Sequence, residues 1–256
     1  MDSGLTTETS LSFNVNWTDE VYEPDAEIAI DNDSYTAYIR PYCVDNDGVL
    51  IEDILLSVYR REFNGEFTEL SKDIDNVKNT AITDPHPALD YARYRIVAMS
   101  KTTGAISYYD VPAYPVGGIG VVIQWDEEWS SFDTTNSDPM QQPPWTGSML
   151  KLLYNVDISS NHNKDTTLVQ YIGRKRPVGY YGTQLGETYT WSVEIPATDV
   201  ETLYAIRRLA TWTGDVYVRE STGSGYWASI NINFEQKHNK LTIPITFDIT
   251  RVEGGI

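Results

Sequence analysis

The chain has 256 residues, of which 12% are aromatic and 18 are tyrosines, so it is long enough for one large domain or two small ones. Its 37 acidic and 19 basic residues give a net charge of -18, concentrated in the first half. A surface that grips nucleic acid sequence-specifically needs a local excess of Lys and Arg, so that class of function is disfavoured. Residues 1–10 lack basic residues and an apolar run, and no stretch approaches the length of a membrane span. We therefore expect neither a secretion signal nor membrane insertion.

Residues 1–115 alternate strand patterns with turn signals at the spacing typical of a β-sandwich. We predict strands at 11–17, 35–43, 54–62, 67–70, 94–99 and 105–109, whereas the acidic residues 19–34 are strand-poor. Asn64-Gly65 is the strongest hairpin signal, because both residues tolerate positive φ. The one cysteine, Cys43, cannot form an intramolecular disulfide and is expected to be a half-buried strand residue.

A Pro/Gly-rich segment at 112–118 cannot continue a central strand and predicts a linker between domains 1–115 and 116–256. In the second domain we predict a polar loop at 132–144 and strands at 121–125, 149–154, 167–171, 189–194, 215–220, 226–234 and 241–252. Gly223-Ser224-Gly225 suits the tip of a hairpin, which we expect to form an exposed sheet edge. Pro244 suggests that the last strand is an edge strand or begins there.

One short helix is predicted, at 198–210, where Thr198 and Glu201 have the spacing of a capping box. Apolar residues then recur at steps of three and four, and the last turn is basic, as the helix dipole favours; these residues are Val200, Leu203, Ile206 and Ala210, with Arg207 and Arg208. Such a helix covers a sheet. The predicted fold is therefore mainly β: an N-terminal β-sandwich followed by a second β-sandwich with one short packed α-helix.

The first domain resembles a fibronectin type III domain over its later strands, at residues 58–61, 65–67 and 84–98. In that family a Tyr-x-Val-x-Ala strand follows a corner that contains Leu, and Tyr94, Ile96 and Ala98 fit this pattern. Residues 19–34 depart from it. The resemblance implies a fibronectin III-like sandwich for residues 1–115.

Residues 150–254 resemble tail proteins of long-tailed, siphovirus-type bacteriophages and prophages of Gram-positive bacteria, in particular distal-tail and baseplate components. The order of the segments carries the likeness: 171–178, 180–184, the helix, the hairpin after Val218-Arg219, and 251–255. The resemblance implies a ring-forming domain, usually hexameric, in a structural protein of the virion tail that is made in the host cytoplasm.

The partners implied by this resemblance are copies of the chain and other tail proteins, namely the tube, the tail-tip or baseplate hub and the tape measure. The acidic first domain would decorate the outside, where it could contact host cell-surface polymer. The tube, distal-tail and baseplate positions all remain open.

A ring-forming subunit needs directional contacts, and arginine forks can pair with the carboxylates of a neighbouring copy. The candidate assembly residues are Arg174, Arg176, Tyr180, Tyr181, Arg207, Arg208, Arg219, Tyr226 and Trp227. For Arg174-Lys175-Arg176 a solvated loop and a phosphate site are the alternatives. Arg207 and Arg208 are equally explained by compensation of the helix dipole.

Catalytic and metal-binding patterns are weak. Asp126-Glu127-Glu128 could be imagined as a carboxylate pair for glycoside cleavage, but adjacent strand residues point to opposite faces. The histidines are isolated in sequence: His86, His162 and His238. We therefore expect no enzyme activity, no cofactor and no bound metal.

The alternative function is a carbohydrate-binding module. In this interpretation, aromatic side chains line a sugar-stacking surface on a β-sandwich, whereas aromatic residues in strands usually belong to the core. The tryptophans concerned are Trp125, Trp129, Trp145, Trp191, Trp212 and Trp227.

Overall fold

The computed structural model describes residues 21–78, 80–126, 147–235 and 241–253, with the side chains of 183–185 left aside. The predicted strand at 11–17 and the predicted polar loop at 132–144 lie outside these residues. The described chain is mainly β with a single helix, which confirms the predicted fold class. No helix in this part of the chain is long and apolar enough to cross a membrane.

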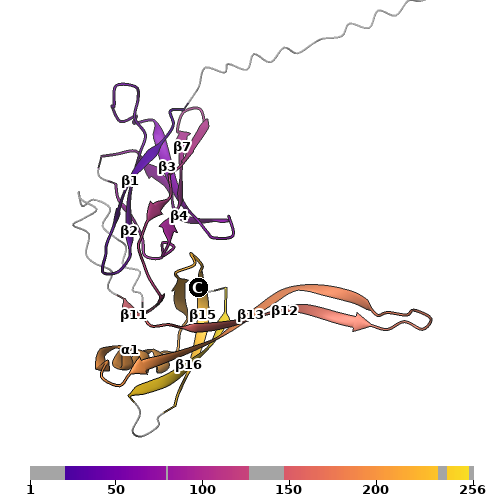
Figure 1. The fold of residues 1–256 in the computed structure, drawn as a ribbon. Helices are drawn as coiled ribbons and strands as arrows, with labels where there is room; N and C mark the ends of the chain where they lie inside the picture. The colour runs from indigo at the N-terminus through magenta and orange to yellow at the C-terminus, as the bar shows by residue number, and fades with distance from the viewer. Residues whose placement is uncertain (1–20, 79, 127–146, 236–240, 254–256) are drawn as a thin grey trace, which may run out of the picture.

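The first nine strands belong to the N-terminal module (Figure 1). They are β1 (Asp25–Ile30), β2 (Ala37–Tyr42), β3 (Ile54–Arg61), β4 (Phe67–Asp75), β5 (Ile82–Asp84), β6 (Tyr91–Ala92), β7 (Tyr94–Ser100), β8 (Ile106–Asp110) and β9 (Tyr114–Pro115). Their antiparallel pairing gives a sheet ordered β1-β2-β5, a second ordered β4-β3-β7-β8, and the short pair β6-β9.

Strand alternation builds the core of this module. In β7 every second residue is buried, beginning with Tyr94 and Ile96, because successive strand side chains point to opposite faces. These residues pack in one apolar cluster with Leu56 of β3 and Ile39 of β2, so the core receives side chains from both larger sheets. The two sheets therefore enclose one core, as in a sandwich.

Several local predictions for this module can be compared with the structure. The Asn64-Gly65 hairpin is confirmed: Gly65 has φ 89°, and its N–H donates to the Glu62 carbonyl at 2.9 Å. Residues 19–34 are not strand-poor, because β1 lies within them. Cys43 is completely buried rather than half-buried, and its thiol donates to the Tyr22 carbonyl at 3.3 Å.

The segment at 112–118 is not a free linker. Its β9 pairs with β6, and Val116 is 5% exposed with its N–H donating to the Asp90 carbonyl at 3.3 Å. Proline is tolerated here because β9 is only two residues long and has one neighbour. The chain therefore enters the second module along a packed path.

The C-terminal module holds the remaining strands and the helix. They are β10 (Val121–Trp125), β11 (Ser148–Leu152), β12 (Asp157–Val169), β13 (Val178–Pro196), α1 (Val200–Ala210), β14 (Val216–Glu220), β15 (Gly225–Phe234) and β16 (Thr242–Arg251). The strands form one antiparallel sheet ordered β11-β10-β14-β15-β16-β13-β12. Its core includes Ile123, Trp191 and Phe247, each 0% exposed.

The N-cap of the helix lies one residue later than predicted. Asp199, not Thr198, is the N-cap, and its carboxylate accepts the Thr202 N–H at 3.1 Å. The buried stripe consists of Leu203, Ile206 and Leu209, whereas the predicted core residue Val200 is 69% exposed. The three buried residues join the core of the seven-stranded sheet, so α1 does cover it.

The β14–β15 hairpin is not the exposed edge that we predicted. It lies in the middle of the sheet, between β10 and β16, and the edges are β11 and β12. Pro244 also lies in an internal strand, but its carbonyl pairs with Glu235 beyond the end of β15. Its missing N–H therefore faces the point where the neighbouring strand stops, which is why an internal strand tolerates it.

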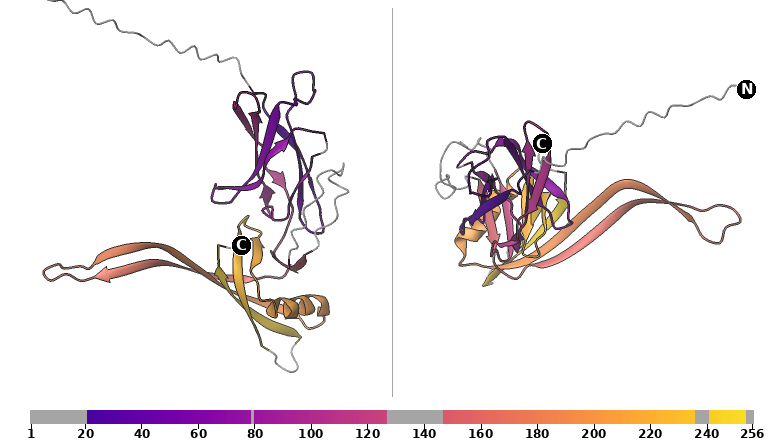
Figure 2. Two further views of the ribbon diagram at one scale, coloured as in Figure 1. Left: turned by 180° about the vertical axis from the view of Figure 1, so that it is seen from behind. Right: turned by 90° about the horizontal axis from the view of Figure 1, so that it is seen from above.

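The most extended feature is a two-stranded arm, which we define as residues 161–187 of β12, β13 and their connecting turn (Figures 1 and 2). β13 has a third-strand partner, β16, only from Thr188 onward, so the ribbon before that residue pairs with itself alone. At about 3.3 Å per residue it reaches roughly 30 Å beyond the sheet. A register shift between Lys164 and Thr166 marks a bulge, which increases local twist.

Gly120, just before β10, packs closely against the backbone of Leu152, and a substitution there tests how much this close approach contributes to stability. It has φ +75°, and an added Cβ would lie 2.1 Å from the Leu152 carbonyl oxygen. Gly65 has φ +89° with open space around it, so Gly65→Ala introduces backbone strain alone. We expect Gly120→Ala to lower the free energy of unfolding by about 1–3 kcal/mol more than Gly65→Ala does. Equal losses in urea denaturation would contradict the close approach at Gly120.

Candidate functional site

Four of the predicted assembly residues lie together on the arm. Arg174 and Arg176 are in the turn at its tip, and Tyr180 and Tyr181 begin its return strand, 52% and 75% exposed respectively. The structure therefore places this group on one projecting element. Arg207 and Arg208 are also exposed, but they lie in the last turn of α1, at the opposite end of the molecule from the arm tip (Figure 1).

The other three predicted residues are used inside the chain. Arg219 is 0% exposed, and its guanidinium donates to the carbonyl oxygens of Ser34, Tyr35 and Pro87 at 3.0–3.2 Å. It thus ties β14 to the N-terminal module and does not present a fork to a neighbouring copy. Sequence reasoning took an arginine beside a predicted sheet edge to be exposed, but this strand is central.

Tyr226 and Trp227 likewise differ from the expected exposed pair. Tyr226 is 3% exposed, and its hydroxyl donates to Glu220 at 3.0 Å. Burial and the Glu220 carboxylate raise the pKa of Tyr226 far above its usual range. Trp227 is partly exposed, and its side chain lines a cleft.

The arm combines exposed apolar side chains with very little burial. Ile172 at the tip is 107% exposed, Leu168 is 65% exposed, and every residue of β12 except Val169 is exposed. The tip itself is ordered by local contacts: the hydroxyls of Tyr171 and Tyr180 lie 2.6 Å apart, and Gly173 has φ 87°. The arm is a defined ribbon whose large apolar side chains are mostly exposed.

The charge of the arm is opposite to that of the chain. Residues 166–186 contain Arg174, Lys175 and Arg176 and no acidic residue, although the whole chain carries -18. The Arg174 guanidinium lies 5.8 Å above the Tyr171 ring. The tip thus presents cations next to aromatic and aliphatic surface.

A buried polar network joins the two modules, and sequence reasoning did not identify it. Asp84 is 0% exposed and accepts hydrogen bonds at 2.8 Å from both the Arg60 guanidinium and the Tyr94 hydroxyl. Arg60 also donates to the Tyr217 hydroxyl of β14 at 3.3 Å. A buried ion pair is costly to break from one side, so the network holds the modules in one arrangement.

His86 completes this junction. Its ring stacks on Tyr217 with centroids 3.8 Å apart and meets Trp227 edge-on at 5.6 Å. Complete burial, with Arg60 and Arg219 nearby, holds the pKa of His86 well below its usual range. The neutral imidazole therefore belongs to the folded junction. The flanking prolines of Asp84-Pro85-His86-Pro87 are the only sequence sign of this constrained corner.

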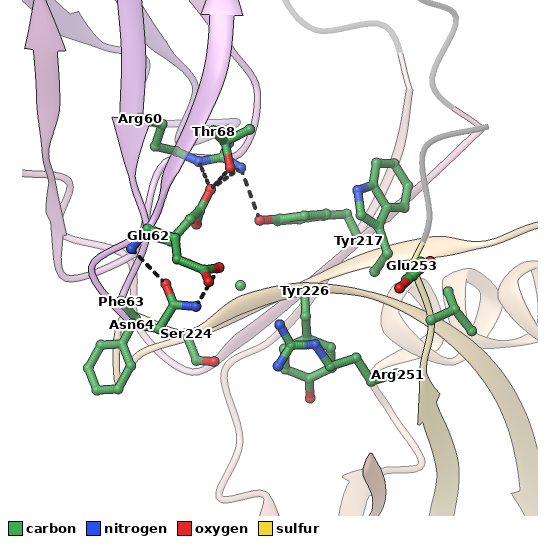
Figure 3. Close-up of a pocket in the computed structure, with 14 residues that line it drawn as sticks. Arg60, Glu62, Phe63, Asn64, Thr68, Tyr217, Ser224, Tyr226, Arg251 and Glu253 are labelled. Atoms are coloured by element: carbon green, nitrogen blue, oxygen red, sulfur yellow. Dashed lines mark hydrogen bonds and ion pairs between the residues drawn. The ribbon is translucent and has the colours of Figure 1, made fainter. Parts of the chain in front are cut away.

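A cleft of about 400 Å³ opens beside this junction (Figure 3). One side is the β3–β4 hairpin, which contributes Glu62, Phe63 and Glu66, and the other side is formed by β15 and the end of β16. Figure 3 shows Glu62 and Asn64 across the cleft from Arg251 and Glu253. The cleft exists only because the two modules are held together.

The residues that the sequence raised as candidates for catalysis or metal binding can be located only in part. No group of three or more His, Cys, Asp or Glu side chains among them is placed to hold a metal ion. Asp126 ends the described segment after β10, and Glu127, Glu128 and His238 lie outside the described residues. The arm and the cleft are the two surface features of the described residues that the arguments above single out.

Comparison of this chain with protein-family models and with curated protein sequences finds no match.

The buried histidine predicts a pH-dependent stability. Below about pH 6.5 the unfolded chain takes up a proton that the folded His86 does not. Because its folded pKa is depressed, the free energy of unfolding should fall as the pH falls, by up to about 1.4 kcal/mol per pH unit, until the folded pKa is reached. His86→Phe keeps an aromatic ring on Tyr217 and removes this titration.

We therefore expect a shallower loss of stability between about pH 6.5 and pH 5 in His86→Phe than in the natural chain, measured by urea denaturation. His162→Phe is the matched control, because the His162 side chain is 62% exposed on the arm. Identical slopes for the natural chain and His86→Phe would show that His86 is not a buried neutral group.

Proposed function

We propose that this chain is a structural, non-enzymatic component of a phage tail or tail-like particle that assembles with copies of itself through the arm. The observation that carries the proposal is the arm: a basic, aromatic ribbon projecting from an acidic chain, with both faces exposed. The resemblance of residues 150–254 to distal-tail and baseplate proteins supports the same reading.

A lone ribbon of this kind needs a partner on energetic grounds. An isolated two-stranded hairpin is at best marginally stable in water, because each strand has only one neighbour and no core is buried. Exposed apolar clusters of this kind mark interaction surfaces in soluble proteins. Ile172 and Tyr181, 107% and 75% exposed, would each be covered by a docked neighbour.

The shape of the chain favours a ring over a twofold dimer. The arm leaves one side of the seven-stranded sheet and extends away from the body (Figure 2). If the arm of one copy docks on the body of the next, different surfaces meet, and such head-to-tail contacts generate closed rings when the rotation closes. The resemblance implies six copies, with the tube, the tail-tip or baseplate hub and the tape measure as further partners in the virion tail.

The carbohydrate-binding alternative receives less support. Trp125 and Trp191 are buried in the core, and the Trp212 indole N–H donates to the Asp215 carbonyl at 3.2 Å near the end of α1. Trp227 is held edge-on against Tyr217. Trp129 and Trp145 lie outside the described residues. The described tryptophans therefore form no exposed row, although contact of the N-terminal module with host cell-surface polymer stays part of the proposal.

Substitutions on the arm test the proposal without disturbing the fold. Ile172→Ser with Tyr181→Ser removes exposed side chains, so the stability of the single chain should change by no more than about 0.5 kcal/mol. We expect assembly to need a roughly hundredfold higher concentration, because each side chain contributes about 1.5–3 kcal/mol when buried. Size-exclusion chromatography with light scattering, followed by negative-stain imaging, measures this.

The matched control is Ile106→Ser with Tyr108→Ser, which removes the same residue types, 64% and 57% exposed, from β8 of the N-terminal module. This control should assemble like the natural chain. If the natural chain stays a monomer at every concentration, or if arm and control variants assemble equally well, the proposal is wrong.

A further inference from the structure

The arm tip carries cations that have no ion-pair partner among the described residues. None of Arg174, Lys175 and Arg176 forms an ion pair with any other described residue. Their backbone is held in place, because the Arg174 N–H donates to the Tyr171 carbonyl at 3.2 Å and the Gln170 amide donates to the Arg174 carbonyl at 2.8 Å. The tip therefore presents its guanidinium groups from an ordered turn.

The cleft between the modules carries carboxylates, whose negative charge is complementary to the positive charge of the arm tip. Glu66 accepts a hydrogen bond from the Asn64 amide at 2.9 Å, and neither Glu66 nor Glu253 forms an ion pair with any other described residue. The two arginines of the cleft are already neutralised: Arg60 pairs with Glu62 and Asp84, and Arg251 pairs with Glu187, at 2.8–2.9 Å. What the cleft offers to a ligand is therefore negative charge.

The cleft also offers rings on which a guanidinium can stack. Phe63 is 69% exposed at its rim, and the partly exposed Trp227 is held rigidly by Tyr217, with centroids 5.2 Å apart. The Arg251 guanidinium already lies 5.6 Å above the Tyr226 ring in the same cleft. Arginine combines such stacking with bidentate pairing to carboxylates, whereas a free phosphate would be repelled here.

The tip cannot reach the cleft of its own chain. In both views of Figure 2 the arm runs outward from the sheet, and its tip points away from the rest of the described chain. The cleft lies at the junction of the modules, near the base of the arm (Figures 1 and 3). Any contact between the two must join different copies.

We infer that the basic tip of the arm docks in the acidic, aromatic cleft of a second copy, an inference that rests on the proposed self-assembly. In this contact Arg174 and Arg176 pair with Glu66 and Glu253 of the neighbour. The donor and the acceptor are different surfaces, so each copy gives one tip and receives another, as a ring requires.

This contact gives the N-terminal module a role beyond decoration. One side of the cleft, including Glu66, belongs to the β3–β4 hairpin of that module. The buried network of Arg60, Asp84 and Tyr217 then has a purpose, because it keeps the two halves of the acceptor site at a fixed separation. The N-terminal module becomes part of the ring.

Charge reversal on the full chain tests the inference. One variant carries Arg174→Glu with Arg176→Glu, and a second carries Glu66→Arg with Glu253→Arg; all four side chains are exposed, and unchanged urea denaturation verifies that each variant folds. Sedimentation velocity over a concentration series should show that each variant alone needs a roughly tenfold or higher concentration to assemble. Both reversals in one chain should restore assembly.

Mixing the tip variant with the cleft variant tests most directly whether the tip of one copy pairs with the cleft of another. In an equimolar mixture of the two variants, every reversed tip can meet a reversed cleft and every natural tip a natural cleft. We therefore expect the mixture to assemble into alternating oligomers near the natural concentration. As a second readout, mixing chains with Arg176→Cys and chains with Glu66→Cys should give a disulfide-linked heterodimer, since the natural Cys43 is 0% exposed.

The outcomes separate the two proposals. If the tip variant loses assembly but the cleft variant assembles like the natural chain, the arm docks elsewhere or the cleft serves another ligand, and this inference is wrong while self-assembly stands. If both variants lose assembly and neither the mixture nor the combined variant restores it, the pairing is also wrong. If the natural chain never assembles, the proposed function and the inference fail together.

Discussion

The ribbon of residues 161–187 is the feature on which this account depends, because it breaks the rule that a sheet buries at least one face. Both outer edges of the ribbon expose backbone N–H and C=O groups, and both faces expose side chains. Natural proteins normally shorten or cover such edges to avoid uncontrolled pairing. A ribbon that is long, bulged, aromatic and uniformly basic at its tip is better explained as an element completed by a specific partner.

The second constraint is the buried junction between the modules. Asp84 would be an isolated buried charge without Arg60, and Arg219 satisfies three carbonyl groups of the N-terminal module from a central strand of the other. These interactions are expensive to break one partner at a time. They join the two modules through buried contacts, and the cleft between the modules depends on those contacts.

The positions of strands and of the helix were predicted well from the sequence where the element buries one face and exposes the other. The strands β7 and β15 and the helix α1 carry apolar residues at the period of their element, because that period follows from the burial of one face. The arm buries neither face, so most of β12 shows no such pattern, and only its last residues were predicted as a strand. Tyr180 and Tyr181 became candidate assembly residues through the family resemblance, and the structure places both side chains exposed on the arm.

The errors share one physical cause. Whether a strand is central or at an edge depends on pairing between distant segments, so the positions of β14 and β15 in the sheet could not be read locally. The burial of Arg219 follows from that position, as does the partial burial of Trp227. The junction around His86 depends on contacts between residues more than a hundred positions apart, which no local pattern records.

Hydrogen–deuterium exchange of the arm amides, followed as a function of protein concentration, tests the central claim most directly. Marginally stable ribbon amides exchange rapidly in a single chain and become protected when a neighbour covers them. The account predicts that amides of residues 161–187 gain protection at concentrations where the chain assembles and lose it on dilution, while the core strands stay protected throughout. Equally rapid exchange of the arm in the assembled and the dilute protein would contradict it.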